Sequence, residues 1–175
     1  MDCVVGAVSS DIARYQSPSG DSALVAAVAD SQLYATRDSC DAVIYFIGPG
    51  NMCADPLRSQ ISGCELPWEV TYLVAYSILP FGNDLITMTL TGRQIKDLLE
   101  QQFDNLDPGK NRVLQISQVF SYAWSKRAEG GDKFSIFENG AQRTDGGSDL
   151  EAFVAYLKEH PLISLRLGDR ISLSP

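Results

Sequence analysis

Residues 79–94 read LPFGNDLITMTLTGRQ, and this stretch passes from a turn through a strand pattern to the start of a helix. Asp84 to Leu90 alternates between two sets of side chains, as a β-strand does. Thr91-Gly92-Arg93-Gln94 then matches a capping box, in which a Thr and a Gln side chain bond to the backbone of the first helical turn. The stretch therefore predicts a strand that leads into a helix, with one face formed by Ile95, Leu98, Leu99 and Phe103.

The rest of the chain shows the same mixture of patterns. Strand patterns occur at Val4 to Val8, Ala42 to Ile47 (as a fully buried strand), Val113 to Trp124, Phe134 to Phe137 and Arg170 to Leu173. Helix patterns occur from Ser22 to about Thr36, with Asp21 or Ser22 as the cap, around Glu69 to Ser77, closed by Pro80, and from a second capping box, Ser148-Asp149-Leu150-Glu151, to Pro161. The order predicts an α+β (mixed α/β) fold, which we expect to form one domain over residues 1–175.

Composition limits the functions that the chain can have. Its 175 residues, 45% hydrophobic and 21% charged, can bury a core of their own. We expect a soluble protein, because there is no run of about 18 apolar residues and Met1 to Val5 lacks the pattern of a signal peptide. The net charge of -8 argues against nucleic acid as a partner, although a local site for a small anion is compatible with it.

The groups that catalysis requires are scarce. The chain has a single histidine, His160, beside the helix-ending Pro161, which excludes metal catalysis by several histidines and argues against a Ser-His-Asp triad. Neither phosphate-binding glycine motif is present. Two pairs of acids could in principle act in acid-base catalysis: Asp84 with Asp97, and Asp145 with Asp149. We expect them instead to cap helices and to face solvent. We therefore predict no catalytic residues, no metal ligands and no cofactor, and expect that this chain alone is not an enzyme.

Four cysteines, Cys3, Cys40, Cys53 and Cys64, include no C-x-x-C pair, which argues against a zinc ribbon or a thioredoxin-like site. The four cysteines are therefore expected to form disulfide bonds or to remain free thiols. A bond between Cys53 and Cys64 would restrain the loop-like stretch between Asn51 and Pro67, and a free pair is an equal alternative.

Several motifs together resemble the C-terminal domain of the 5'-nucleotidase family. They are Gly20-Asp21-Ser22-Ala23-Leu24, Val28-Ala29-Asp30, Leu79-Pro80-Phe81-Gly82-Asn83, Leu90-Thr91-Gly92, Leu98-Leu99-Glu100, Leu114-Gln115-Ile116-Ser117, Arg143-Thr144-Asp145-Gly146-Gly147 and Val154-Ala155-Tyr156-Leu157. In that family, the resemblance implies, a separate N-terminal domain holds two metal ions and hydrolyses the substrate, while the C-terminal domain binds the nucleotide. The implied partners are a nucleotide or nucleoside and a metallophosphoesterase domain or other protein chains. The implied location is extracellular or periplasmic.

The resemblance also assigns candidate substrate contacts. Phe81 matches the first of two aromatic rings that hold the base, although a ring between Pro and Gly is also compatible with a core position. The family loop Asn-x-Gly-Gly-x-Arg reads Gly48-Pro49-Gly50-Asn51-Met52-Cys53 here, which makes Gly50 and Asn51 candidates and puts a thiol in the place of a guanidinium.

The second aromatic ring has no counterpart in this sequence. Gly130-Gly131-Asp132-Lys133 resembles the remnant of a Gly-Gly-Asp-Gly turn, which makes Asp132 the fourth candidate; the start of a shortened hairpin is the alternative.

Three hypotheses follow for function. The first is a non-catalytic binding or structural module derived from the nucleotide-binding domain. The second is the substrate-specificity domain of a secreted nucleotide hydrolase whose metal-binding domain is on another segment. The third is an assembly or scaffold component that uses exposed loops such as Asn51 to Leu66.

Overall fold

A computed structural model describes residues 3–10, 12–54, 68–103, 113–118, 120–124, 143–160, 162–163 and 170–173. Within these ranges the helices are α1 (Ala23–Cys40), α2 (Tyr72–Ile78), α3 (Gly92–Gln101) and α4 (Asp149–Glu159), with a short 3₁₀ helix, η1 (Pro49–Asn51). The strands are β1 (Val4–Ala7), β2 (Phe46–Ile47), β3 (Glu69–Thr71), β4 (Asp84–Met88), β5 (Gln115–Ile116), β6 (Tyr122–Trp124), β7 (Arg143–Ser148) and β8 (Ile171–Leu173). The predicted α+β class is confirmed.

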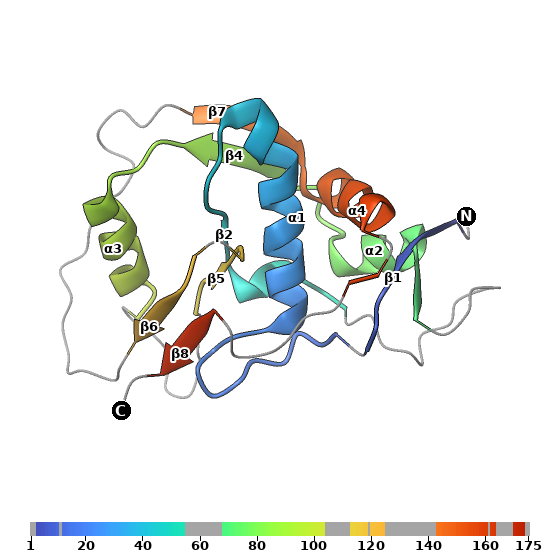
Figure 1. Cartoon of the computed structure of the whole chain (residues 1–175), viewed down its shortest axis with the longest axis horizontal. Helices are drawn as coiled ribbons and strands as arrows, with labels where there is room; N and C mark the ends of the chain where they lie inside the picture. Colours follow the sequence, from blue (N-terminus) through green and yellow to red (C-terminus); the bar gives the residue numbers. More distant parts are fainter. Residues whose placement is uncertain are drawn as a thin grey trace.

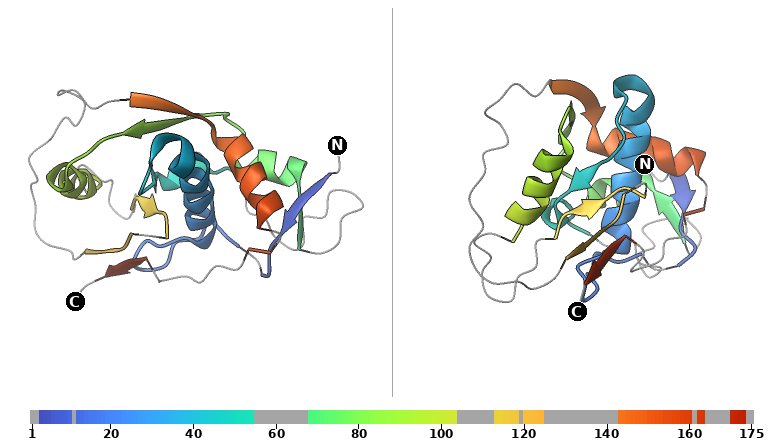
Figure 2. Two further views of the ribbon diagram at one scale, coloured as in Figure 1. Left: turned by 45° about the horizontal axis from the view of Figure 1, so that its top comes forward. Right: turned by 60° about the vertical axis from the view of Figure 1, so that its left-hand side comes forward.

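The strands form four pairs, which lie around α1 (Figure 1). The pairs β1–β3, β2–β5 and β4–β7 are antiparallel, and β6–β8 is parallel. Both views in Figure 2 place α2, α4 and β1 on one side of α1, and α3, β6 and β8 on the other. Helix α1 is therefore the central element of the fold.

Helix α1 is buried along most of its length, which exceeds the single apolar stripe that its sequence predicts. Leu24, Val25 and Val28 are at most 1% exposed, and so are the polar Ser31 and Gln32. The alanines between them let neighbouring elements approach closely, so the helix is packed on several sides. It also runs past Thr36 to Cys40, where Asp41 adopts a left-handed conformation and closes it.

Two apolar clusters flank α1. The larger joins α1 to α2, α4 and β1 and includes Ile78, Phe153 and Leu157. Strand β1 passes so close to α4 that a Cβ added at Gly6 would lie 2.7 Å from the Leu157 carbonyl oxygen. The smaller cluster contains Val113, Ile116 and Ile171, with Phe46, Phe103, Phe120, Tyr122 and Trp124 packed against it.

Four predictions of secondary structure are confirmed. The first strand, the strand that leads into α3, two strands between residues 113 and 124, and the strand before the C-terminus are all present. The capping box of Thr91 and Gln94 forms with both of its hydrogen bonds. The strand predicted at Phe134 to Phe137 lies outside the described residues.

Three predictions are wrong. Residues 42–45 do not form the predicted buried strand, and Val43 is 73% exposed. Only Phe46–Ile47 forms a strand pair, because its partner β5 has two residues. Glu69–Thr71 is a strand and not the start of a helix, because it pairs with β1. At α4, Ser148 occupies the N-cap position, but its side chain makes no capping hydrogen bond.

Strand β7 was not anticipated. Its Asp-Gly-Gly sequence has low intrinsic strand propensity, so only the long-range pairing with β4 makes it extended. The register of the β4–β7 pair shifts between the Asp84–Ser148 pair and the Ile86–Asp145 pair. Gly147, with a φ of +89°, lies at this shift.

Candidate ligand-binding site

Phe81 lies in the turn between α2 and β4. Helix α2 ends at Ile78, where the Leu79 amide donates to the Ala75 carbonyl. Gly82 has a φ of +60°, a conformation that glycine adopts without strain and that reverses the chain just after the ring. The side chain of Phe81 is 61% exposed, so it is not a core residue.

The end of this turn is fixed by Asn83 and Asp149. The Asp149 amide donates to the Asn83 carbonyl at 2.9 Å, and the Asn83 side-chain amide donates to Asp149 Oδ2 at 3.0 Å. Asp149 is only 4% exposed. An exposed aromatic ring thus stands on a turn that is held at its far end by two hydrogen bonds to a buried residue.

The loop that contains Gly50 and Asn51 contacts the same region. Both residues are exposed on η1, whose chain continues into Met52, a core residue with 3% exposure. The Cys53 amide donates to the Ile78 carbonyl at 3.1 Å, which ties the loop to the last residue of α2. The loop of the predicted candidates Gly50 and Asn51 is therefore tied, through Cys53, to the helix end that precedes the turn of Phe81.

Arg14 reaches this loop from a segment that sequence reasoning did not single out. Its Nη1 donates to the Met52 carbonyl at 3.1 Å, and the residue is exposed. A guanidinium thus lies beside Cys53, the position where the sequence lacks one. No spacing in the sequence indicates a contact between residues so far apart in the chain.

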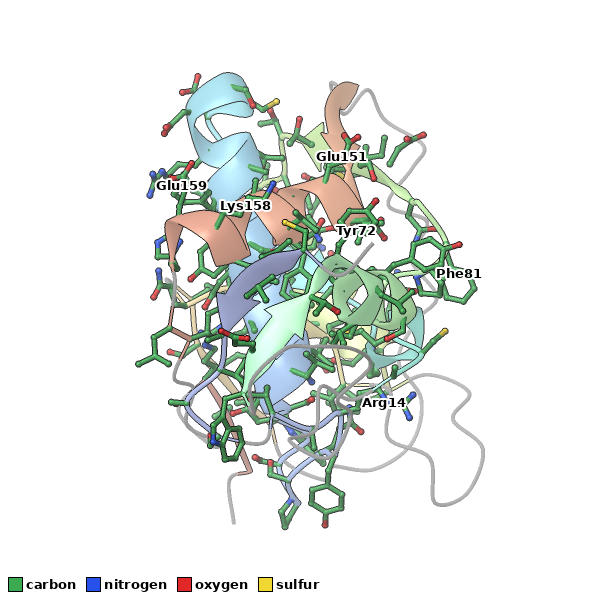
Figure 3. All side chains as sticks on the ribbon, turned by 90° about the vertical axis from the view of Figure 1, so that its right-hand side faces the viewer. Arg14, Tyr72, Phe81, Glu151, Lys158 and Glu159 are labelled. Atoms are coloured by element: carbon green, nitrogen blue, oxygen red, sulfur yellow. The ribbon has the colours of Figure 1, made fainter. Side chains whose placement is uncertain are left out.

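An apolar surface adjoins the turn. Tyr72, Leu73 and Tyr76 lie on the outer face of α2 and are 39–50% exposed, whereas Val74, Ala75 and Ile78 on its inner face are buried. Figure 3 shows Tyr72 and Phe81 at the two ends of this helix. This α2 surface is larger than the scattered single apolar residues that soluble proteins expose.

The match to a protein family covers most of the chain. Residues 4–157 match the family model described as 5'-nucleotidase, C-terminal domain. The chain belongs to this family. The resemblance that the sequence motifs indicated is therefore confirmed, and the fold of this 5'-nucleotidase C-terminal domain can be compared with solved relatives.

Two solved structures share the fold. The 5'-nucleotidase precursor from Thermus thermophilus superposes with a TM-score of 0.78 at 23% identity, over 97% of this chain and 39% of that chain. The NAD nucleotidase (NadN) of Haemophilus influenzae superposes with a TM-score of 0.65 at 18% identity, over 99% of this chain and 39% of that chain.

A curated relative matches over a shorter stretch. The trifunctional nucleotide phosphoesterase protein YfkN of Bacillus subtilis (strain 168) is 28% identical over 92 residues, which are 53% of this chain and 6% of that protein. The 5'-nucleotidase C-terminal domain described here therefore spans well under half the length of each of these three relatives.

Asp149, which holds Asn83 in this 5'-nucleotidase C-terminal domain, also affects the phenol of Tyr45. Burial, together with the Asp149 carboxylate, raises the pKa of Tyr45 to about 12. Tyr45 packs against the large apolar cluster, and its amide donates to Ser117 Oγ. Its phenol therefore stays neutral at physiological pH.

Asp132 lies outside the described residues. Other acids and the histidine that the sequence singled out have separate places among the described residues. Asp97 is in α3, where it pairs with Arg93 at 4.0 Å, whereas Asp84 begins β4. His160 follows α4 as its C-cap, and its ring stacks on Tyr156 with a centroid separation of 4.1 Å.

Cysteines and metal-binding groups add nothing to the site. Cys53 is a free, exposed thiol, which does not support the hypothetical bond to Cys64, and Cys64 itself lies outside the described residues. Among the described residues, no group of three or more His, Cys, Asp or Glu side chains is placed to hold a metal ion. None of the helices in the same part of the chain has the length and apolar character that crossing a membrane requires.

Proposed function

We propose that this chain is a non-catalytic recognition module that binds the nucleoside part of a nucleotide against Phe81. The observation that carries the proposal is the 61% exposed ring on a turn that Asn83 and Asp149 hold in place. Stacking of a base on one phenyl face contributes about 0.5–1.5 kcal/mol beyond burial. A turn whose backbone is held before a ligand arrives loses less conformational freedom on binding, which favours this use of Phe81.

Gly50 and Asn51 are proposed to contact the same ligand, since Cys53 ties their loop to the end of α2. Asp132 remains a candidate contact from its resemblance alone. Arg14 is the cation that we assign to the phosphate of a nucleotide, because its guanidinium bonds to the carbonyl of Met52, the residue before Cys53. One exposed guanidinium is a weaker anion site than a buried, forked set of donors, so we expect modest preference for nucleotide over nucleoside.

Calorimetric titration with adenosine and with AMP tests the proposal. We expect weak binding of both, with a Kd nearer to millimolar than to nanomolar. Phe81→Ala should weaken both ligands about three- to tenfold, whereas Phe81→Trp should retain them. For adenosine, Tyr15→Ala is the matched control, because Tyr15 is also an exposed ring, at 73%, and lies on a different segment from Phe81.

Arg14→Gln separates the two contacts. It should weaken AMP but not adenosine, and the difference should shrink as salt is raised, because ionic contacts at a surface are screened. Absence of binding of either ligand to the unaltered protein, or equal affinity of Phe81→Ala, would overturn the proposed function.

A second candidate function is favoured by the length of the relatives. Each solved relative is longer than this chain, which covers 39% of it, so the chain is proposed alternatively as the substrate-binding part of a nucleotide hydrolase. In that case its partner is a metallophosphoesterase domain, and its location is extracellular or periplasmic. Mixing the chain with such a domain should then raise phosphate release from AMP, and no increase for any nucleotide would remove this candidate.

A third candidate, an assembly component, is favoured by the α2 surface formed by Tyr72, Leu73 and Tyr76. Size-exclusion chromatography at several concentrations tests it against the variant Leu73→Glu. If the unaltered protein stays monomeric at every concentration and binds no partner, the α2 surface does not serve assembly.

A further inference from the structure

Asp149 is a buried carboxylate, and its link to the proposed ligand contacts runs through Asn83. It is the first residue of α4, and its side chain is almost wholly removed from water. Burying a carboxylate requires that its oxygens be hydrogen-bonded. Both are: Oδ1 accepts from the Leu150 amide at 2.7 Å, and Oδ2 accepts from the side-chain amide of Asn83 at 3.0 Å.

The backbone of Asp149 is held as firmly as its side chain. Its amide donates to the Asn83 carbonyl at 2.9 Å, and its carbonyl accepts from Gln32 Nε2 of α1 at 3.0 Å. Gln32 is fully buried. Asp149 therefore connects the central helix to Asn83, and Asn83 is two residues from Phe81.

The contacts give Asn83 a fixed place although it is exposed. Its carbonyl and its side-chain amide both bond to Asp149, whereas a Cβ added at the neighbouring Gly82 would meet no atom within 4 Å. These two bonds hold the end of the turn that leads into β4. Asp149 therefore fixes the backbone two residues after Phe81.

We propose that Asp149 is a positioning residue, which orients the Phe81 ring for ligand stacking by holding Asn83. The inference rests on the proposed function for the role of the ring, but the geometric claim can be tested without a ligand. A carboxylate suits the position because both of its oxygens must accept. An asparagine there would turn an NH₂ group toward the amide of Asn83 or of Leu150.

The experiment compares Asp149→Asn with the exchange variant Asn83→Asp/Asp149→Asn. In the exchange variant, the amide at position 149 donates to a carboxylate at position 83, so the hydrogen bond is restored with its direction reversed. We expect Asp149→Asn to lose affinity for adenosine by about three- to tenfold and the exchange variant to regain most of it. Asp38→Asn, at an exposed carboxylate of α1, is the control.

A spectroscopic readout separates positioning from folding. Phe81→Trp, labelled with 5-fluorotryptophan, gives a fluorine resonance for position 81 beside those of Trp68 and Trp124. We expect one sharp resonance in the parent, a broadened or divided one after Asp149→Asn, and a sharp one again in the exchange variant. The resonances of Trp68 and Trp124 should stay unchanged, which shows that each variant is folded.

The outcomes are distinct. If the position-81 resonance of a folded Asp149→Asn variant remains sharp and unshifted, or if the exchange variant recovers neither the resonance nor the affinity, Asp149 does not position the ring. If instead the resonance responds as expected and the unaltered protein binds no adenosine or AMP, the geometric role stands and the proposed function fails.

Discussion

Single residues of this domain are constrained by backbone conformation as much as by side-chain chemistry. Gly20 has a φ of +90°, and an added Cβ would lie 2.7 Å from Val113 Cβ. Gly92 lies in the first turn of α3, and a Cβ added there would have no atom within 4 Å. The same residue type therefore has opposite roles at these two places.

Alanine substitution at these two glycines should have opposite effects. We expect Gly20→Ala to reduce the free energy of unfolding by about 2–4 kcal/mol, through left-handed strain and overlap with Val113. Gly92→Ala should leave it unchanged or raise it by up to about 1 kcal/mol, because alanine restricts the unfolded chain. Urea unfolding monitored by circular dichroism measures both, and equal effects would contradict the structure.

Tyr45 gives the fold a dependence on alkaline pH. Burial and Asp149 raise the pKa of its phenol to about 12, above the usual value of 10 in an unfolded chain. The folded state therefore holds this proton more tightly, so the stability it contributes is complete below pH 10 and is lost as pH rises from 10 to 12. Tyr45→Phe should reduce the loss of thermal stability across that window, with Tyr15→Phe as the comparison. An identical profile in the Tyr45→Phe variant would refute this assignment.

At the scale of elements, the helices differ in what stabilises them. Helix α3 has no fully buried residue, but its N-terminus carries a complete capping box, in which Gln94 N donates to Thr91 Oγ1 and Thr91 N donates to Gln94 Oε1. Helix α4 buries Phe153 and Leu157, and its N-cap Ser148 makes no capping bond. Local bonding thus matters for α3, and packing matters for α4.

Substitution of the two N-cap residues tests this difference. Thr91→Ala should lower the free energy of unfolding, or of local opening of α3, by about 1 kcal/mol. Ser148→Ala is the matched change at α4 and should cost much less, because no side-chain bond is lost. Hydrogen exchange of the α3 and α4 amides measures the local effect; a larger cost at Ser148 would show that the cap assignment is wrong.

At the scale of the whole molecule, a buried ion pair joins distant parts of the chain. Arg170 beside β8 donates two hydrogen bonds to Asp30 of α1, at 2.9 and 2.7 Å, and the two side chains are 12% and 5% exposed. Arg170 also donates to the carbonyls of Ala26 and Ile116, and Asp30 accepts from the Gln118 amide. The C-terminal strand is therefore attached to the central helix by polar contacts.

Removal of one partner of this pair should be costly. We expect Asp30→Ala to lower the free energy of unfolding by about 3–5 kcal/mol, because it leaves the buried guanidinium of Arg170 without its charge partner. Asp38→Ala, at an ion pair with Arg37 whose side chains are 57–85% exposed, should change it by less than about 0.5 kcal/mol. Thermal unfolding of both variants measures the difference, and a small cost at Asp30 would mean that the pair is not structural.

The sequence by itself determined the α+β class, the capping box of α3 and most helix locations, because these depend on periodicity and on contacts between residues close in the chain. Its motifs also indicated the family by resemblance, and the same resemblance identified Phe81, Gly50 and Asn51 as candidates. The sequence did not decide whether the ring of Phe81 is buried.

Only the tertiary structure decided the rest. Strand β7 and the strand at Glu69–Thr71 are extended because distant strands pair with them, and in β7 this pairing overrides the low strand propensity of Asp-Gly-Gly. Arg14 reaches Met52, and Asp149 holds Asn83, through contacts between segments far apart in the sequence. The exposure of Phe81 follows from the same cause, since the turn that carries it is placed by α1 and α4, and no local pattern contains that information.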